Sequence, residues 1–258
     1  MISMRVSFMI NVLIPMAGSG SRFSAAGFLK PKPFIDVLGK PMIRHVIENL
    51  AIPDARYILV AQRDHLHKEQ KLVNEIQKSH NTIFIPVDKL TEGTACTVLY
   101  ARKFINNNVP LLIANSDQIV DFDAQTFVEN CKTRQLDGSI LAFHDLSRNP
   151  KWSFVRIESD ELAVEVKEKH PISDLATVGI YLFSKGSDFV DAAIEMILNR
   201  DKTNNEYYTC PVYNYLIKDG KKIGVYKISS KEMHGLGTPE DLSLYLELNK
   251  FRDKNKGK

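Results

Sequence analysis

The sequence predicts an α/β protein of three layers, α/β/α, with a mostly parallel, Rossmann-like sheet and a mixed C-terminal extension. Two observations predict this fold class. Through the first half of the chain, short apolar runs alternate with segments of helical periodicity, which is the pattern of βαβ units. Beyond about residue 136 the alternation stops, and short strand-like runs follow one another across polar turns.

The first half is expected to alternate strands and helices. Each expected strand is a short run rich in Val, Ile and Leu. These runs lie at 12–14, 35–38, 56–61, 82–87 and 110–114. Helices are expected from Pro41 to Leu50, from a cap at Asp64 to about Ser79, from Thr94 to Ile105, and from a cap at Asp123 to near Gln135.

The second half is expected to contain more strands. They lie at 139–143, 153–157, 162–166, 176–183 and 223–228. Helices are expected at 187–199, at about 210–218, and in a final segment opened by residues 238–241. Since no internal repeat or disordered linker divides the chain, residues 1–258 are expected to form one domain.

Composition is that of a soluble globular protein, with 44% hydrophobic and 25% charged residues. The net charge is only +3, and the basic run at 250–258 is interpreted as a solvated chain end, so no nucleic-acid partner is expected. No apolar stretch is long enough to cross a membrane, and the apolar start, MISMRVSFMI, lacks the features of a signal peptide. Met4 and Met9 could each be the true start.

The three cysteines, Cys96, Cys131 and Cys210, are odd in number and lack the spacing of metal ligands. They are expected to be small buried hydrophobic residues of a protein kept in a reducing compartment. A cytoplasmic location is therefore expected.

The stretch 11–40 is the first candidate site. A buried strand leads into a loop of small residues containing Gly18 and Gly20, followed by Arg22. Glycines let a backbone approach a ligand and turn successive N–H groups into one concavity, and an arginine can clamp phosphate oxygens. Lys32 follows between two prolines that stiffen its segment. The stretch therefore predicts a polyphosphate site.

The glycines alone are a weak signal, and a plain strand-to-helix turn is the alternative. Phe23 stands where a dinucleotide fingerprint has its third glycine. The Gly-Lys-Ser/Thr of an ATPase phosphate loop is absent. The two added cations, Arg22 and Lys32, favour the phosphate interpretation.

The motif of these residues resembles that of the nucleotide-sugar pyrophosphorylases, the sugar-1-phosphate nucleotidyltransferases. GSGSRF, then Pro-Lys-Pro, then GKPMI follow the family signature Gly-x-Gly-x-Arg with a spaced Pro-Lys-Pro. The resemblance implies a GT-A-like nucleotidyltransferase fold with a nucleotide-binding half at about 10–135 and an acceptor-binding half at about 136–250. It implies that Met16, Ala17, Gly18, Ser19, Gly20, Ser21, Arg22 and Lys32 hold a nucleoside triphosphate.

The resemblance extends to two further nucleotide elements. Glu92, Gly93 and Thr94 resemble the family's turn at the base and ribose, where a glycine would let a flat base press on the backbone. A simple helix cap by Thr94 is the alternative. Ser116 and Asp117 follow the strand expected at 110–114. The resemblance implies that Ser116 contacts the nucleotide and that Asp117 binds magnesium, which suits a hard oxygen ligand at a strand end.

An acceptor site is implied by the second half. Glu168 and Lys169 resemble a Glu-Lys-Pro element in which His170 is inserted before the proline, and they would bind an acceptor hydroxyl and the acceptor phosphate. A solvated strand end is the alternative for this charged run. The resemblance places the other acceptor contacts at Ser153, Val178, Gly179 and Glu206. Arg22, Lys32 and Lys169 would be the catalytic cations.

One departure from the family pattern concerns the metal. Many relatives read Asp-x-Gly-Thr near the C-terminus, and that Asp is a second metal ligand, whereas this chain has Gly235 at the position. Either Asp117, phosphates and water hold one magnesium, or another group such as His234 or Glu206 compensates. The sequence leaves these alternatives open.

The function implied is transfer of a nucleotidyl group from an NTP to a phosphorylated acceptor, most simply a sugar 1-phosphate, with release of pyrophosphate. A role in capsule or surface-polysaccharide synthesis and a homo-oligomeric state are compatible with it. One alternative is a cytidylyltransferase acting on choline phosphate or on an amino-acid phosphate of capsule phosphoramidate synthesis. Others are a glycosyltransferase, although Asn115-Ser116-Asp117 is not its Asp-x-Asp, and a non-catalytic nucleotide sensor.

Overall fold

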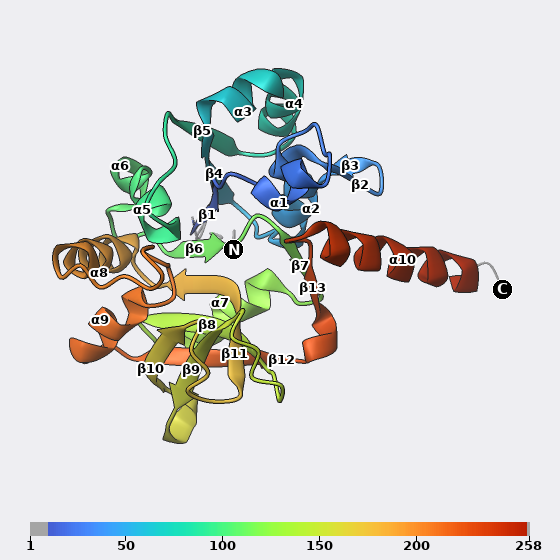
Figure 1. Cartoon of the computed structure of the whole chain (residues 1–258). Helices are drawn as coiled ribbons and strands as arrows, with labels where there is room; N and C mark the ends of the chain where they lie inside the picture. The colour runs from blue at the N-terminus through green and yellow to red at the C-terminus, as the bar shows by residue number, and fades with distance from the viewer. Residues whose placement is uncertain (1–9, 257–258) are drawn as a thin grey trace, which may run out of the picture.

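The computed structural model describes residues 10–256, and side chains as far as residue 249. The expectations about Met4, Met9 and the N-terminal segment concern residues outside this range. A nine-stranded sheet forms the centre of the molecule, with helices on both faces (Figure 1). Between residues 10 and 256, no helix combines the length and the apolar character needed to span a bilayer.

The first half of the sheet is parallel. Its strands are β1 (Ile10–Met16), β4 (Ala55–Gln62), β5 (Thr82–Val87) and β6 (Leu111–Ala114). β1 lies between β4 and β6, and β5 flanks β4, so the chain moves outward from β1 in both directions. This reversal of strand order is the doubly wound arrangement that the sequence predicts.

The second half makes the sheet mixed, as predicted. Its strands are β8 (Gly138–His144), β9 (Ser153–Ile157), β10 (Ala163–Glu168), β11 (Leu175–Phe183) and β12 (Ile223–Ile228). β11 joins the two halves, because it pairs antiparallel with β6, β8 and β9. Ala176 of β11 pairs with Phe143 of β8 and with Phe154 of β9, so these two strands lie on opposite sides of β11. β12 runs parallel to β8.

Two apolar clusters confirm the three layers. One face of the sheet is covered by α5 (Thr94–Leu99), α6 (Arg102–Ile105), α8 (Gly186–Leu198) and α9 (Val212–Lys218). The other face is covered by α2 (Met42–Asn49), α3 (Arg63–Lys68), α4 (Gln70–Ser79) and α7 (Ala124–Thr133). Successive residues of β1 alternate between the clusters, with Leu13 in the first and Val12 and Ile14 in the second. A strand that is apolar on both faces is typical of a buried parallel sheet.

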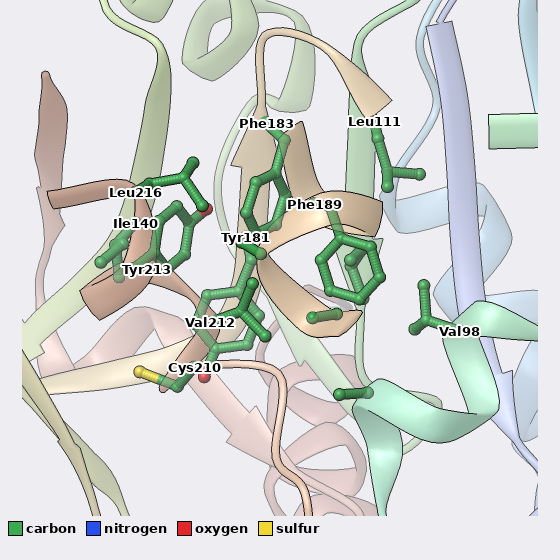
Figure 2. Close-up of a cluster of buried hydrophobic side chains, with 14 of the residues drawn as sticks. Val98, Leu111, Ile140, Tyr181, Phe183, Phe189, Cys210, Val212, Tyr213 and Leu216 are labelled. Atoms are coloured by element: carbon green, nitrogen blue, oxygen red, sulfur yellow. The ribbon is translucent and has the colours of Figure 1, made fainter. Parts of the chain in front are cut away.

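Aromatic packing fills the first cluster in the second half of the chain. Phe183 of β11 stacks on Tyr213 of α9 with ring centroids 4.5 Å apart and meets Phe189 of α8 edge-on (Figure 2). The buried Tyr213 hydroxyl donates to the backbone oxygens of Leu182, at 2.9 Å, and Ser139, at 3.2 Å. The helices are thereby fixed to the strands that carry the candidate acceptor residues.

The structure corrects several expected elements. The helix 64–79 is divided into α3 and α4 at Glu69, and the cap position of α3 is Gln62 rather than Asp64, with no side-chain cap. The helix 94–105 is divided into α5 and α6. Of the strand expected at 35–38, only β2 (Asp36–Val37) forms, and it pairs in a hairpin with β3 (Lys40–Pro41). The cap by Asp123 is confirmed, since its carboxylate accepts from the Thr126 amide.

Short elements complete the fold. α1 (Ser21–Ala25) and the 3-10 turn η1 (Lys32–Phe34) follow the glycine loop. β7 (Gln118–Val120) and β13 (Met233–Gly235) form an unexpected antiparallel pair, and η2 (Ser159–Glu161) and η3 (Ser230–Glu232) are single 3-10 turns. The last helix, α10 (Pro239–Lys256), extends away from the sheet (Figure 1).

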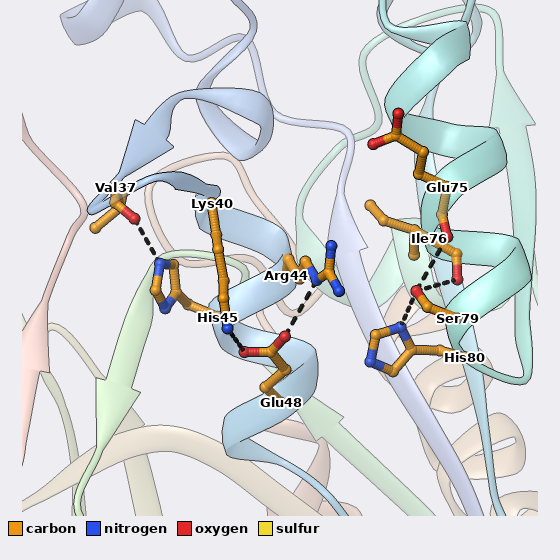
Figure 3. A network of polar contacts seen from close by, with 9 residues as sticks. All are labelled: Val37, Lys40, Arg44, His45, Glu48, Glu75, Ile76, Ser79 and His80. Carbon is orange, nitrogen blue, oxygen red and sulfur yellow. Dashed lines mark hydrogen bonds and ion pairs between the residues drawn. The ribbon is translucent and has the colours of Figure 1, made fainter.

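Polar contacts fix the hairpin that follows the Pro-Lys-Pro segment. Glu48 of α2 accepts from Lys40 Nζ at 2.7 Å and from Arg44 Nε at 3.1 Å, and a His45 ring nitrogen lies 2.6 Å from the Val37 oxygen (Figure 3). Exposed ion pairs such as that of Lys40 and Glu48 contribute little stability one by one, but together these contacts hold β2 and β3 against α2.

Figure 3 also shows Ser79 at the end of α4. Its hydroxyl donates to the backbone oxygen of Glu75 and lies within hydrogen-bond distance of His80 Nδ1.

Candidate functional site

The candidate site lies where strand order reverses. β1 and β6 are adjacent parallel strands, and their carboxyl ends lead into the glycine loop and into residues 115–117. In open α/β sheets the crevice beyond such a pair is the usual place for a ligand. The two nucleotide motifs, far apart in the sequence, therefore share one edge of the sheet.

Gln62 holds the glycine loop. Its amide nitrogen, at the end of β4, donates to the backbone oxygens of Ala17 at 3.0 Å and Gly18 at 3.2 Å. Met16 and Ala17 are buried, whereas Gly18 and Ser19 are exposed. Carbonyl oxygens repel phosphate, so engaging them elsewhere favours an anion at the loop. The sequence analysis did not assign Gln62 to the site.

Gly20 permits the turn from the loop into α1. Its φ is +62°, in the left-handed region, and a Cβ there would lie 3.2 Å from the Lys32 Cβ. A side chain at position 20 would therefore strain the backbone and press on the lysine. Arg22 follows and is exposed on α1. Hydrogen bonds in the first turn of α10 are the main cause that lowers the pKa of Glu240, and the charge of Arg22 lowers it further.

Lys32 and Asp117 form an ion pair at the centre of the candidate site. Lys32 Nζ contacts the Oδ2 atom of Asp117, and the two side chains are 19% and 25% exposed. The ammonium also lies 5.9 Å from the centre of the Phe23 ring. Both charges are thus partly desolvated yet open to a ligand, and the lysine is placed by packing as well as by charge.

Asp117 is the first candidate ligand for magnesium. Among residues 10–256, no group of three or more His, Cys, Asp or Glu side chains is arranged to hold a metal. Asp117 is a hard carboxylate ligand, and magnesium commonly binds one or two carboxylates while phosphates and waters complete its shell. The Asp117 carboxylate therefore fits a magnesium ion whose remaining ligands are water and polyphosphate oxygens.

The turn at Glu92, Gly93 and Thr94 is bonded to the segment around Tyr207. The backbone oxygen of Glu92 accepts from the Tyr207 amide at 2.7 Å, and the Ala95 amide donates to the backbone oxygen of Tyr207 at 3.0 Å. Thr94 Oγ1 accepts from the Thr209 amide at 3.1 Å. The interpretation of Thr94 as a helix cap is wrong, since Gly93 occupies the cap position of α5 with no side-chain cap.

Replacement of Gly93 by alanine is expected to destabilise the protein by at least about 3 kcal/mol. Its φ of +116° disfavours a side chain, and a Cβ would lie 2.6 Å from the Tyr207 nitrogen. Denaturant unfolding would measure the loss. Gly220→Ala is the matched control, because Gly220 has a φ of +75° but open space around its Cβ position, so it should lose only about 1 kcal/mol. Equal losses would contradict the steric explanation.

Ser153 and Glu168 meet across β9 and β10. Ser153 Oγ donates to Glu168 Oε2, and the strand register pairs the same two residues. Burial raises the pKa of Glu168, an effect that the serine and Lys169 oppose and that the charge of Glu206 adds to. A partly buried carboxylate with one neutral donor retains lone pairs for a hydroxyl of a ligand.

Lys169 belongs to a polar chain with Tyr208 and Glu206. Lys169 Nζ donates to the Tyr208 hydroxyl at 2.5 Å and lies 4.5 Å from the centre of that ring. Burial raises the pKa of Tyr208, and a hydrogen bond to Glu206 raises it further. Lys169 has a φ of +54°, and its amide donates to the Trp152 oxygen at 3.0 Å. The lysine is therefore held in a strained backbone state by its neighbours.

Gly179 connects the two halves of the site. Its oxygen accepts from the backbone amide of Asn115 at 3.1 Å. Its φ is +87°, and a Cβ at this position would clash with the Asn115 side chain, whose Cγ would lie only 2.9 Å away. The neighbouring Val178 is 1% exposed, so only its backbone could meet a ligand. The glycine therefore makes room for a side chain close to Asp117.

The structure thus brings the expected residues together in two groups. Gly20, Lys32 and Asp117 form the first, and Ser153, Glu168, Lys169 and Glu206 form the second. Among the described residues, Ser116 has no side-chain hydrogen bond and is half-buried. The sequence analysis assigned no role to Gln62, Asn115 or Tyr208. Gln62 directly follows the strand expected at 56–61, so its place at the end of a strand could have been predicted, whereas no local sequence pattern indicates a role for Tyr208.

Comparisons with known proteins identify the family of the chain. A family model described as nucleotidyl transferase matches residues 11–244. The bifunctional protein GlmU of Methanocaldococcus jannaschii is 25% identical over 247 residues, which cover 94% of this chain and 54% of that protein. The mannose-1-phosphate guanylyltransferase catalytic subunit beta of Danio rerio is 26% identical over 187 residues, covering 68% of this chain and 50% of its own length. This chain spans about half the length of these curated relatives.

A solved structure shows the same fold. The nucleoside-diphosphate-sugar pyrophosphorylase of Vibrio cholerae RC9 superposes with a TM-score of 0.78 at 24% sequence identity, covering 92% of this chain and 99% of that one. The sheet with its reversal of strand order, the paired Lys32 and Asp117, and the family match over 11–244 lead to one conclusion. The chain belongs to the nucleotidyl transferase family.

Proposed function

We propose that this chain transfers a nucleotidyl group from a nucleoside triphosphate to a phosphorylated small molecule, most simply a sugar 1-phosphate, releasing pyrophosphate. The observation that carries the proposal is the Lys32–Asp117 pair beside the glycine loop, at the carboxyl ends of β1 and β6. Family membership supports it, as do the sugar 1-phosphate named for the guanylyltransferase relative and the sugar nucleotide named for the structural neighbour.

The reaction needs positioning and charge neutralisation more than proton transfer. An anionic phosphate oxygen of the acceptor attacks the α-phosphorus in line, a new P–O bond forms, and the bond to pyrophosphate breaks. Because the nucleophile already carries its charge, no general base is required. Most of the acceleration would come from fixed cations and from holding both substrates in register.

The nucleotide half supplies the first set of contacts. The loop from Met16 to Ser21 and the exposed Arg22 would bind the triphosphate, and Lys32 would neutralise charge at the reacting phosphates. Asp117 would hold magnesium, which when bound adds positive charge at the phosphate oxygens. Glu92, Gly93, Thr94 and Ser116 would contact the nucleoside.

The acceptor half supplies the opposing contacts. Lys169, positioned by Tyr208, would bind the acceptor phosphate, and Glu168 with Ser153 would bind an acceptor hydroxyl. Glu206 would act at the same pocket, and Gly179 would keep the acceptor close to the nucleotide side. Since one sheet carries both halves, we propose that they work as a single catalytic unit in the cytoplasm.

Pyrophosphate release from a screen of four NTPs against phosphorylated acceptors tests the proposal. The acceptors include several sugar 1-phosphates, choline phosphate and an amino-acid phosphate, each with magnesium. Turnover with a sugar 1-phosphate is the expected result. Turnover only with CTP and a non-sugar phosphate would instead support the alternative function, a cytidylyltransferase acting on choline phosphate or an amino-acid phosphate.

Two other outcomes would contradict nucleotidyl transfer. Hydrolysis of a nucleotide-sugar donor without pyrophosphate chemistry would indicate a glycosyltransferase, although residues 115–118 carry no Asp-x-Asp. NTP binding in calorimetry with no turnover on any acceptor would indicate a nucleotide sensor. The joint presence of Lys32, Asp117 and Lys169 supports the enzyme.

A further inference from the structure

The segment from Gly235 to Gly237 runs directly beside Asp117. β13 pairs with β7 so that Gly235 lies opposite Gln118, and the Leu236 amide donates to the backbone oxygen of Asp117 at 2.7 Å. Relatives that carry an acid at position 235 would place it in this segment, whereas here the position has no side chain. Among the described residues assigned so far, Asp117 is therefore the one carboxylate at the magnesium position.

The two groups considered as substitutes are engaged elsewhere. The His234 Nε2 atom lies 3.1 Å from an Asp121 carboxylate oxygen. Neighbouring residues of a strand point to opposite faces, so the His234 ring lies on the face of β13 opposite to the one that a side chain at 235 would occupy. Glu206 is hydrogen-bonded to Tyr208, in the acceptor half. Neither group takes the place of the missing acid.

A different carboxylate occupies the space beside the two glycines. A Cβ at Gly235 would have Asp241 Cγ at 3.7 Å and Asp241 Oδ2 at 3.8 Å as its nearest neighbours. A Cβ at Gly237 would lie 3.3 Å from Asp117 Oδ2 and 3.8 Å from Asp241 Oδ2. The Asp241 carboxylate therefore lies beside both glycines, on the side where Asp117 also approaches Gly237. Because Gly237 has no side chain, nothing from that position separates the two carboxylates.

The backbone around Asp241 is well anchored. Its amide donates to Thr238 Oγ1 at 3.1 Å, at the start of α10. The next residue, Leu242, is 4% exposed and packs with Leu236 and Phe23 in the cluster beneath the glycine loop. A ligand placed by a capped helix turn and a buried neighbour is held in position before a metal binds.

We propose that Asp241 supplies the second carboxylate of the magnesium site, in place of the acid absent at Gly235. The proposal rests on the nucleotidyl transfer proposed above. Two carboxylates, with phosphate and water oxygens, are a donor set that magnesium accepts. The missing aspartate would then have been replaced from the first turn of the following helix, without loss of the site.

Mn²⁺ binding to the full-length protein without substrates tests this assignment, with free Mn²⁺ followed by electron paramagnetic resonance. Asp241→Asn and Asp117→Asn should each weaken Mn²⁺ binding by at least about tenfold. Glu240→Gln is the matched control, since it removes the same charge from the same turn of α10 at an exposed side chain, and it should change the affinity less than about twofold.

A rescue variant separates metal binding from a structural role at the helix start. Gly235→Asp in the Asp241→Asn background returns an acid to the family position, where a Cβ has only ordinary contacts, and it should restore most of the Mn²⁺ affinity. A thermal unfolding curve of each variant measures any helix effect separately, because a charge that only stabilised the start of α10 would change the unfolding temperature together with the Mn²⁺ affinity. Lowered Mn²⁺ affinity in Asp241→Asn at an unchanged unfolding temperature, restored by Gly235→Asp, is the result expected of a metal ligand.

Three results would overturn the proposal. They are unchanged Mn²⁺ affinity in Asp241→Asn, a failure of the rescue in a folded protein, and no measurable Mn²⁺ binding by the unmodified protein. Circular dichroism of each variant establishes folding. Because the measurement uses no substrate, its outcome is independent of the acceptor screen, and a failure of nucleotidyl transfer in that screen would be recognised separately.

Discussion

Lys32→Ala is expected to reduce pyrophosphate release by at least about a thousandfold while the protein stays folded. The ammonium contacts Asp117 and lies over the Phe23 ring at the proposed triphosphate site, where its charge acts on the phosphates in a partly desolvated setting. Removing one partner of this pair should cost little stability, since both side chains retain access to water. Steady-state pyrophosphate assays and a thermal unfolding curve measure the two effects.

Lys40→Ala is the control for Lys32. It removes a lysine from the same stretch, but Lys40 is 46% exposed and pairs with Glu48 on α2, away from the glycine loop. We expect near-normal turnover for this variant. If Lys32→Ala also turned over at near-normal rate, the assignment of the stretch 11–40 to the triphosphate would be wrong.

Lys169→Ala is expected to lower kcat/KM for the acceptor by about a hundredfold or more, with little change in the apparent affinity for the NTP. Lys169 is the cation of the acceptor half, and it is held by the Tyr208 hydroxyl at 2.5 Å. The loss should be larger when the acceptor phosphate carries two charges than when it is a monoanionic ester. Initial rates over a grid of both substrate concentrations separate the two affinities.

Tyr208→Phe tests whether the tyrosine acts through the lysine. The ring and its contact with Lys169 Nζ remain, but the hydrogen bond from the lysine and the link to Glu206 are lost. A loss of about tenfold in acceptor kcat/KM is expected, and in the Lys169→Ala background the substitution should have almost no further effect. Additive losses would show that Tyr208 acts on the acceptor independently.

Local patterns were sufficient for the main elements of the fold. Short apolar runs located the parallel strands, because a strand buried on both faces is apolar along most of its length. The pairing of β7 with β13 was not predicted, since each strand has three residues and the pair joins segments more than a hundred residues apart in the sequence. The division at Glu69 carries no glycine or proline to announce it.

The site follows the same division between local and distant information. The loop around Gly20 and the cation Lys32 could be predicted, because their chemistry is contained in one stretch. The partners of Lys169 and Gly93 could not, because Tyr208 and Tyr207 reach them only in the folded chain. Gly93 was expected to admit a base, and the structure shows that the Tyr207 backbone fills the space a Cβ would need.

The bonds between residues 92–95 and 207–209 have a consequence for how such enzymes can be recombined. Glu92, Thr94 and Ala95 exchange backbone and hydroxyl hydrogen bonds with Tyr207 and Thr209. The segment proposed to read the base is therefore built against the segment that carries the acceptor pocket. Selectivity for the nucleoside therefore cannot be changed by exchanging residues 92–95 alone. We expect a chimaera that receives this turn from another enzyme to fold correctly only if it also receives the segment that replaces residues 207–209.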